Sequence, residues 1–301
     1  MKEIKIRSLV SKIKHFPNYT KNHLIISYLK NKDSFNNIHI RTKKHPQIVV
    51  SLTSYKKRFD TLDICLKSIF LQTMLPDRLI LYLSENESYT DLPQKIRNLQ
   101  NYGLEIKFVK GDLRPHKKYY YAMKEFPEDI VITIDDDVIY DKNLIRDLWE
   151  SHLKFKDCII ATRAHQMTFD EKGKLQSYKK WNLLSTLEDT PRMDLVATGV
   201  GGVLYPPHLL NELLLNDMKK ISEYIDVDDL WLKNVELNSN IPTVICKEGS
   251  ILEKHRIDIP NTQITALFNK NVIKNNNDRA LKKLDEQYDF SRKVLHSINK
   301  N

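Results

Sequence analysis

The sequence has few cysteines and glycines, and it lacks any long apolar run. Its three cysteines, Cys65, Cys158 and Cys246, are far apart and form no C-x-x-C pair, which argues against a disulfide framework and a zinc knuckle. The seven glycines form neither G-x-G-x-x-G nor the P-loop pattern, so both nucleotide fingerprints are absent. No apolar stretch reaches the roughly eighteen residues of a membrane span, and the N-terminus lacks the apolar core of a secretory signal. We therefore expect a cytoplasmic protein.

The net charge of +9 fits three kinds of partner: nucleic acid, an anionic membrane surface or an anionic substrate. Neither an RNA-binding aromatic signature nor zinc-finger spacing is present, so we expect no nucleic acid. Within a basic segment of 46 residues, residues 2–16 carry apolar side chains at helical spacing with basic residues between them. This pattern predicts an amphipathic helix on an anionic bilayer, and hence a peripheral position on the inner face of the cell membrane. A helix packed on the protein's own core is the alternative.

From residue 47 to about 145, short β-branched runs alternate with segments of helical periodicity. This alternation predicts an α/β fold with a mostly parallel sheet flanked by helices, in which ligands bind at the carboxyl ends of the strands. The second half, residues 146–260, is less regular: we expect a strand over 157–165, a polar stretch at 170–190 and a helix over 208–218. A further helix is expected over 277–298. We expect a basic N-terminal extension over 1–46, a single catalytic domain over 47–260 and a helical tail over 261–301.

Three consecutive carboxylates, Asp135, Asp136 and Asp137, end the apolar run of VITIDDDVIY. On an extended backbone Asp135 and Asp137 face one side and Asp136 faces the other. Two carboxylates on one side at a strand end suit Mg²⁺ or Mn²⁺, which fills its remaining positions with phosphate oxygens. The alternative is a polar strand terminus that caps the next helix.

A second acidic group, Asp226, Asp228 and Asp229, precedes an apolar helical stretch. One of these carboxylates could cap the helix, while another could face a cleft and act as a general base. The segment TGVGG allows close approach of the backbone to a ligand. Several basic residues follow the ends of predicted strands and could pair with a diphosphate, although solvated surface side chains are the simpler interpretation; they are Arg58, Arg114, His116, Lys117 and Lys118.

Four segments in this order resemble bacterial family 2-like glycosyltransferases of the GT-A fold. They are VVSLTSYKKRFDTLDICLKSIFLQ, DIVITIDDDV, TGVGGVLYPP and DVDDLWL, and the resemblance covers roughly residues 47–260. One departure is Leu52, which stands where the family often has proline, so the details of the base pocket do not carry over.

The resemblance implies a role for individual residues. On the nucleotide-sugar side it implies Thr53, Tyr55, Arg58, Glu85, Lys118, Asp135 and Asp136. Asp137, Asp135 and a late histidine, His255, would bind the metal, and Asp228 or Asp229 would be the catalytic base. Gly201, Gly202 and Trp231 would lie on the side of the acceptor and donor sugar.

The function implied is a Mn²⁺- or Mg²⁺-dependent, inverting glycosyltransferase. It would move a sugar from a nucleotide-sugar, with a UDP-sugar as the first expectation, to a glycan or lipid-linked acceptor in capsule, O-antigen or other surface polysaccharide synthesis. A nucleotidyltransferase of related fold is one alternative, although SLTSYKKR lacks the glycine-rich loop of those enzymes. A non-catalytic binder of anionic surfaces or nucleic acid is the other.

Overall fold

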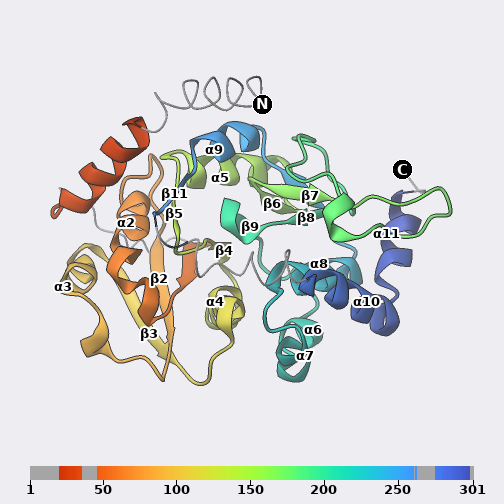
Figure 1. The fold of residues 1–301 in the computed structure, drawn as a ribbon, viewed down its shortest axis with the longest axis horizontal. Helices are drawn as coiled ribbons and strands as arrows, with labels where there is room; N and C mark the ends of the chain where they lie inside the picture. The colour runs from red at the N-terminus through yellow and green to blue at the C-terminus, as the bar shows by residue number, and fades with distance from the viewer. Residues whose placement is uncertain (1–19, 36–45, 261, 263–274, 299–301) are drawn as a thin grey trace, which may run out of the picture.

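A seven-stranded sheet runs through the computed structural model, which describes residues 20–35, 46–260, 262 and 275–298 (Figure 1). The predicted amphipathic helix at 2–16 lies outside these residues. Along the sheet the strands follow the order β10 (Thr243–Ile245), β6 (Ile159–Ala161), β9 (Val203–Tyr205), β4 (Ile130–Thr133), β1 (Ile48–Thr53), β2 (Arg78–Ser84) and β3 (Leu104–Val109). β9 runs antiparallel to β4 and β6, whereas the other neighbours are parallel. The mixed, mostly parallel sheet predicted from the sequence is therefore confirmed.

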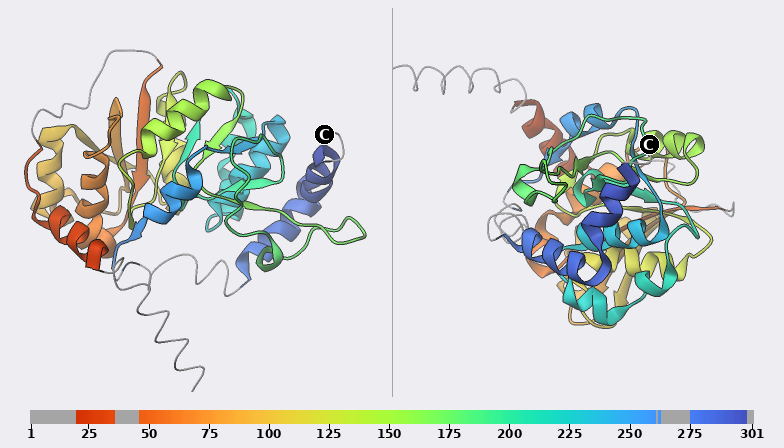
Figure 2. Two further views of the ribbon diagram at one scale, coloured as in Figure 1. Left: turned by 90° about the horizontal axis from the view of Figure 1, so that it is seen from above. Right: turned by 90° about the vertical axis from the view of Figure 1, so that its right-hand side faces the viewer.

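Helices cover both faces of this sheet. Those described are a helix over residues 20–31, α2 (Phe59–Ile69), α3 (Gln94–Arg97), α4 (Lys117–Glu125), α5 (Leu144–Lys154), α6 (Glu212–Leu215), α7 (Met218–Glu223), α8 (Asp228–Ser239), α9 (Gly249–His255), α10 (Asn276–Tyr288) and α11 (Phe290–Ile298). The helix over 20–31 lies at the opposite end of the molecule from α10 and α11 (Figures 1 and 2). In the described ranges, no helix is both long enough and apolar enough to cross a bilayer.

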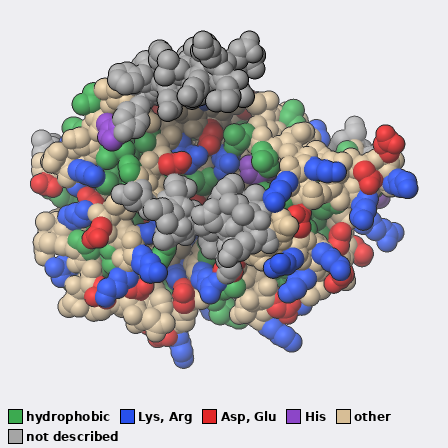
Figure 3. Space-filling model, viewed as in Figure 1, with side chains coloured by type: hydrophobic (Ala, Val, Ile, Leu, Met, Phe, Trp, Pro, Cys, Tyr) green, Lys and Arg blue, Asp and Glu red, His purple; other side chains and the backbone are tan. Residues whose placement is uncertain are grey.

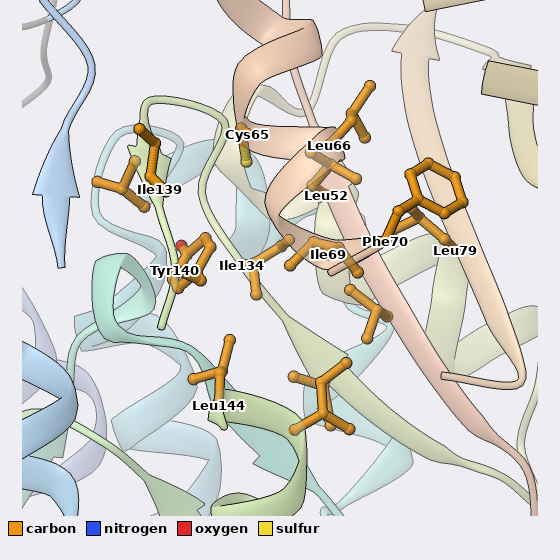
Figure 4. Packing of buried hydrophobic residues seen from close by; sticks show 14 of the residues in the cluster. Leu52, Cys65, Leu66, Ile69, Phe70, Leu79, Ile134, Ile139, Tyr140 and Leu144 are labelled. Atoms are coloured by element: carbon orange, nitrogen blue, oxygen red, sulfur yellow. The ribbon is translucent and has the colours of Figure 1, made fainter. Parts of the chain in front are cut away.

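The central strands are apolar on both faces because each face packs on helices. Val50 and Leu52 of β1 belong to a core shared with α2 and α5, whereas Val49 packs with α4. Figure 4 shows part of the first core, including Ile134 and Tyr140, which flank the three aspartates in the sequence. The turn that carries these carboxylates is thus anchored by buried apolar side chains on both sides.

Two small sheets extend the second half. β5 (Val138–Ile139) pairs antiparallel with β11 (Ile257–Asp258), directly after the aspartates. β7 (Ala164–Gln166) pairs antiparallel with β8 (Leu195–Ala197). The predicted strand over 157–165 is therefore split into β6 and β7, because the chain leaves the main sheet after Ala161.

Two predicted helices are also divided. The helix expected over 208–218 becomes α6 and α7, because Asn211 and Asp217 each cap the start of a helix through a side-chain oxygen. The helix expected over 277–298 becomes α10 and α11, because Asp289 takes a left-handed conformation with φ of 54°.

Candidate active site

A cavity of about 830 Å³ opens at the carboxyl ends of the central strands. The turn after β1 contributes Thr53, Ser54 and Tyr55, and the turn after β4 contributes the three aspartates. The opposite wall comes from the first turn of α8 and from the segments that follow β6 and β8. This is the edge at which an open α/β sheet is expected to bind its ligand.

Arg58, at the end of the short 3₁₀ helix η1 (Lys56–Arg58), forms ion pairs with two of the three aspartates. Its Nη1 donates to Asp136 Oδ1 and lies 3.0 Å from Asp137 Oδ2. Ser54 Oγ donates to the other oxygen of Asp136 at 2.5 Å. The prediction that Asp136 turns away from Asp137 is therefore wrong, because β4 ends at Thr133 and strand alternation no longer applies beyond it.

Burial raises the pKa of Asp136, although Arg58 and Ser54 favour its charged form. Burial and the nearby charge of Asp135 raise the pKa of Asp137 to about 6, against the effect of Arg58. Both carboxyl groups thus hold their protons more tightly than free aspartate does. A further cation in this turn would stabilise their charged forms.

Lys118, in the first turn of α4, joins the two acidic groups. Its Nζ donates to Asp135 Oδ1 at 2.7 Å and lies 3.0 Å from Asp228 Oδ2, and its side chain is 4% exposed. Burial by itself would lower the pKa of Lys118, but Asp135, Asp228 and Asp229 outweigh it and the pKa is raised. The ammonium group is therefore a permanent charge between the β4 turn and α8.

Asp228 and Asp229 occupy the first turn of α8, and neither caps it, because the N-cap is Val227. The backbone N–H of Gly199 donates to Asp229 Oδ1 at 3.0 Å. Burial and the charge of Asp228 raise the pKa of Asp229 to about 8. For Asp228, burial is outweighed by Lys118 and His116, so its pKa is lowered. One carboxyl of the pair is therefore an anion at neutral pH, while the other retains its proton.

Gly199 is a site residue that sequence reasoning did not select. A Cβ at this position would lie 2.5 Å from Lys118 Nζ and 3.4 Å from Asp229 Oδ1, so a side chain would displace the ammonium group. The glycine-rich segment TGVGG contains Gly199, but the resemblance to the family assigned a role only to Gly201 and Gly202. Gly201 is packed against Thr162, and Gly202 has φ of +95°, which favours glycine.

Of the predicted nucleotide-side residues, Thr53 and Tyr55 line the cavity together with Arg58. Thr53 Oγ1 donates to the carbonyl of Tyr82 at 2.8 Å. Glu85 is exposed and accepts the N–H of Gly111 at 2.9 Å, outside the cavity lining.

Trp231 and His255 lie outside the cavity lining as well. Trp231 is 0% exposed and stacks on Tyr224 with ring centroids 5.3 Å apart, so it belongs to the core rather than to the sugar side. His255, at the end of α9, is paired through Nδ1 with Asp141 Oδ2 at 2.8 Å. The structure thus brings together the aspartates, Arg58 and Lys118 but not these two side chains.

The opposite wall contains further residues that the sequence did not reveal, namely Arg163, His165 and Tyr178. Arg163 lies inside the strand predicted over 157–165, so nothing in the sequence marked it as a residue beyond a strand end. Tyr178 lies in the polar stretch 170–190, where no periodicity marks it.

A divalent cation fits the turn after β4, although in the described part of the chain no three His, Cys, Asp or Glu side chains form a complete metal site. Asp137 Oδ1 is buried and has no hydrogen-bond partner among the described residues. In the same part of the chain, two cations, Arg58 and Lys118, contact four carboxylates, which are those of Asp135, Asp136, Asp137 and Asp228. Such a site matches the preference of Mg²⁺ and Mn²⁺ for one or two carboxylates completed by substrate oxygens.

Several solved structures are similar to this chain, each at a TM-score below 0.5. TarS 1–349 from S. aureus, in complex with UDP, is 13% identical, with 66% of this chain and 57% of that chain covered and a TM-score of 0.43. The mannosyltransferase PcManGT from Pyrobaculum calidifontis, in complex with GDP-Man and Mn²⁺, is 12% identical, with 78% and 64% covered and a TM-score of 0.41. The chain thus spans less than two thirds of either. No curated protein matches the sequence.

The sequence profile of the family described as "Glycosyl transferase family 2" matches residues 50–203. The match extends from β1 to the start of β9 and includes the turn with the three aspartates and the Gly199 segment. It covers just over half of the 301 residues. The chain therefore belongs to glycosyl transferase family 2.

Proposed function

We propose that this protein is a metal-dependent glycosyltransferase that moves a sugar from a nucleotide-sugar to a hydroxyl group of a glycan or lipid-linked acceptor. The observation that carries the proposal is that two groups of acidic residues, one in the turn after β4 and one in the first turn of α8, line the same cavity. The turn after β4 holds a buried carboxylate oxygen that has no hydrogen-bond partner among the described residues, and α8 holds a carboxyl group with a raised pKa. The first suits a cation–diphosphate unit, and the second suits a general base.

On the donor side, Tyr55 and Thr53 would line the nucleotide pocket beside Arg58. Asp137 and Asp135 would hold Mn²⁺ or Mg²⁺, which when bound supplies positive charge to the departing diphosphate. Lys118 adds a fixed positive charge beside Asp135, in a cavity wall where it needs no reorganisation during the reaction.

On the acceptor side, we assign the base to Asp229. Its partner Asp228 is committed to Lys118, whereas Asp229 is held only by the N–H of Gly199 among the hydrogen bonds described. A carboxyl group whose pKa lies near neutrality is a stronger base than ordinary aspartate once it is ionised. Asp229 would take the proton of the acceptor hydroxyl, whose oxygen attacks the sugar carbon on the face opposite the nucleotide. The configuration at that carbon would then be inverted.

The test is a screen of UDP-, GDP-, CMP- and dTDP-sugars for hydrolysis with Mn²⁺, with thermal shift by UDP, GDP, CMP and dTDP as a second readout. We expect one nucleotide, UDP first, to stabilise the protein in the presence of Mn²⁺ and much less in excess EDTA. Absence of both stabilisation and hydrolysis for all four would refute the proposal.

The same screen separates this function from binding to an anionic surface. On the face shown in Figure 3, Lys and Arg side chains are interspersed with Asp and Glu rather than gathered into one basic patch. A binder that uses net charge alone would respond to salt and not to the identity of the nucleotide.

We further propose a role in surface polysaccharide synthesis, with the basic segment 2–16 holding the enzyme against an anionic membrane. Deletion of residues 2–16 should weaken binding to vesicles that contain anionic lipid while leaving nucleotide binding intact. Equal vesicle binding by the two proteins would refute the membrane contact.

A further inference from the structure

The wall of the cavity opposite the donor side contains three hydrogen-bond donors that the proposed reaction does not use. Arg163 lies between β6 and β7, His165 lies in β7, and Tyr178 begins the 3₁₀ helix η5 (Tyr178–Lys180). All three line the same cavity as Asp229. They come from short strands and loops of the second half, on the side expected to receive the acceptor.

Arg163 has incomplete charge compensation. Its Nη1 donates to Thr198 Oγ1 at 3.2 Å. Its Nε is buried, has no hydrogen-bond partner in the described part of the chain and lies 3.4 Å from Glu253 Oε1. That carboxylate is already bound twice by Arg256, through Nε at 3.0 Å and Nη2 at 3.1 Å. Arg256 also pairs with Asp258. The ion pair between Arg163 and Glu253 is therefore long, because Arg256 already binds both oxygens of that carboxylate.

His165 presents a neutral donor beside this guanidinium. Its Nδ1 accepts the N–H of Leu184 at 3.1 Å, which assigns the ring proton to Nε2. Burial, together with the charge of Arg163, lowers the pKa of His165 to about 3, so the ring is uncharged at neutral pH.

Tyr178 packs edge-on against His165, with ring centroids 5.8 Å apart. Burial raises the pKa of its hydroxyl, which therefore remains protonated and able to donate. These three side chains consequently offer one cation and two neutral donors, and none of them is a carboxylate.

The position of this wall relative to the base is fixed by a short chain of contacts. Arg163 donates to Thr198, and the next residue, Gly199, holds Asp229 through its N–H. A group bound at Arg163 would therefore lie near Asp229, whose charge also acts on this guanidinium.

We propose that this wall binds an anionic group of the acceptor, a carboxylate or a phosphate, through Arg163, with His165 and Tyr178 as neighbouring donors. The inference rests on the proposed function and specifies the chemical class of its acceptor. A planar guanidinium matches both anions in geometry, and a neutral sugar would leave Arg163 with only its long contact to Glu253.

The test measures binding of three sugars by calorimetry to the protein loaded with Mn²⁺ and the nucleoside diphosphate that stabilises it most. The probes are glucuronate, glucose 6-phosphate and glucose, so the first two separate carboxylate from phosphate. We expect at least one anionic sugar to bind about tenfold or more tightly than glucose, because a hydrogen bond to a charged group contributes on that scale.

Three variants sharpen the test. Arg163→Gln should abolish the preference for the anionic sugar and leave nucleotide affinity unchanged. Glu253→Gln removes the competing carboxylate and should strengthen anion binding. Arg146→Gln is the matched control, because this arginine pairs with Asp147 on α5 and lies outside the cavity lining.

Equal binding of glucose and both anions would overturn the inference while the proposed function stands. A loss of nucleotide affinity in Arg163→Gln would also overturn it, by moving Arg163 to the donor side. If no nucleoside diphosphate binds at all, the proposed function fails, and this inference fails with it.

Discussion

The two acidic groups of the cavity are similar in composition but differ in how their charge is balanced. In the turn after β4, one guanidinium is shared by Asp136 and Asp137, and one oxygen of Asp137 has no hydrogen-bond partner in the part of the chain that the structure describes. In α8, Lys118 holds Asp228 as an anion, while Asp229 accepts a single backbone N–H and has its pKa raised to about 8.

The difference shows that two groups of neighbouring carboxylates can suit different ligands, depending on which cations and N–H groups contact them. The turn after β4 is held by Arg58 and Lys118, and Asp137 Oδ1 has no hydrogen-bond partner among the described residues. This arrangement suits a metal ion. The first turn of α8 divides its pair into one anion and one protonated group, an arrangement that suits proton transfer. Four predictions test whether this division is real.

The largest expected effect is on the base. Asp229→Asn keeps an oxygen for the N–H of Gly199 but removes the proton acceptor, so turnover should fall by about 10²–10⁴-fold while nucleotide binding persists. Asp228→Asn should act mainly on stability, because Lys118 loses one of its two carboxylates. Steady-state turnover and nucleotide titration of both variants check this, and the reverse ranking would assign the base to Asp228.

Lys118→Met should lower the free energy of unfolding by about 3–5 kcal/mol, because it leaves buried carboxylates without their cation. Lys117→Met is the matched control: its partner Asp112 is half-exposed, so water can replace the lost ammonium group. Urea denaturation of the two variants measures the difference. Equal losses would mean that Lys118 is no more important than an ordinary ion-pair residue.

Asp137→Ala should reduce metal-dependent turnover by about 10²–10³-fold while the fold stays intact. Asp141→Ala is a suitable control, since that carboxylate pairs with His255 outside the cavity lining. Turnover with and without excess EDTA and the circular dichroism spectrum provide the measurements. Full activity of Asp137→Ala, or of the wild type in EDTA, would exclude the metal role.

The smallest expected effect is a dependence of stability on pH. Because the folded pKa of Asp229 is about 8 and the ordinary value is about 3.9, the folded state holds a proton that the unfolded state releases. The free energy of unfolding should therefore fall as pH rises through this window, by up to about 1.4 kcal/mol per pH unit from this group.

The comparison that isolates this contribution is wild type against Asp229→Asn in urea at pH 6 and pH 8, both without metal. The decrease should be smaller in the variant, because its amide does not titrate. Asp137 titrates mainly below this interval, since its pKa is about 6. Parallel pH curves for the two proteins would contradict the raised pKa of Asp229.

Much of the donor side could be predicted from sequence because it depends on local order. The apolar run before Asp135 predicts a buried strand, and parallel strands place their carboxyl ends at one edge. The orientation of Asp136 could not be predicted, because it depends on Arg58 and Ser54, which lie about 80 residues earlier. A sequence pattern does not show which distant cation will reach a turn.

The acceptor side was harder to predict because its residues act through tertiary packing. Trp231 follows two cavity residues directly in sequence, yet its ring turns into a core completed by Tyr288 of α10. Arg163 and Tyr178 reach the cavity from short, irregular segments without periodicity. Sequence reasoning therefore found the start of α8 but not the other residues of the same wall.

Because Lys118 contacts both acidic groups, it couples cation binding in the turn after β4 to protonation of the carboxyl pair in α8. A cation bound at Asp135 competes with the ammonium group for the same carboxylate, and any weakening of that contact leaves Lys118 more strongly attached to Asp228. Binding at one end thereby changes proton affinity at the other, and reciprocity requires that protonation of the α8 pair change cation affinity by the same factor. Binding of the cation on the donor side and ionisation of the α8 carboxyl pair are then thermodynamically coupled through the Nζ atom of Lys118.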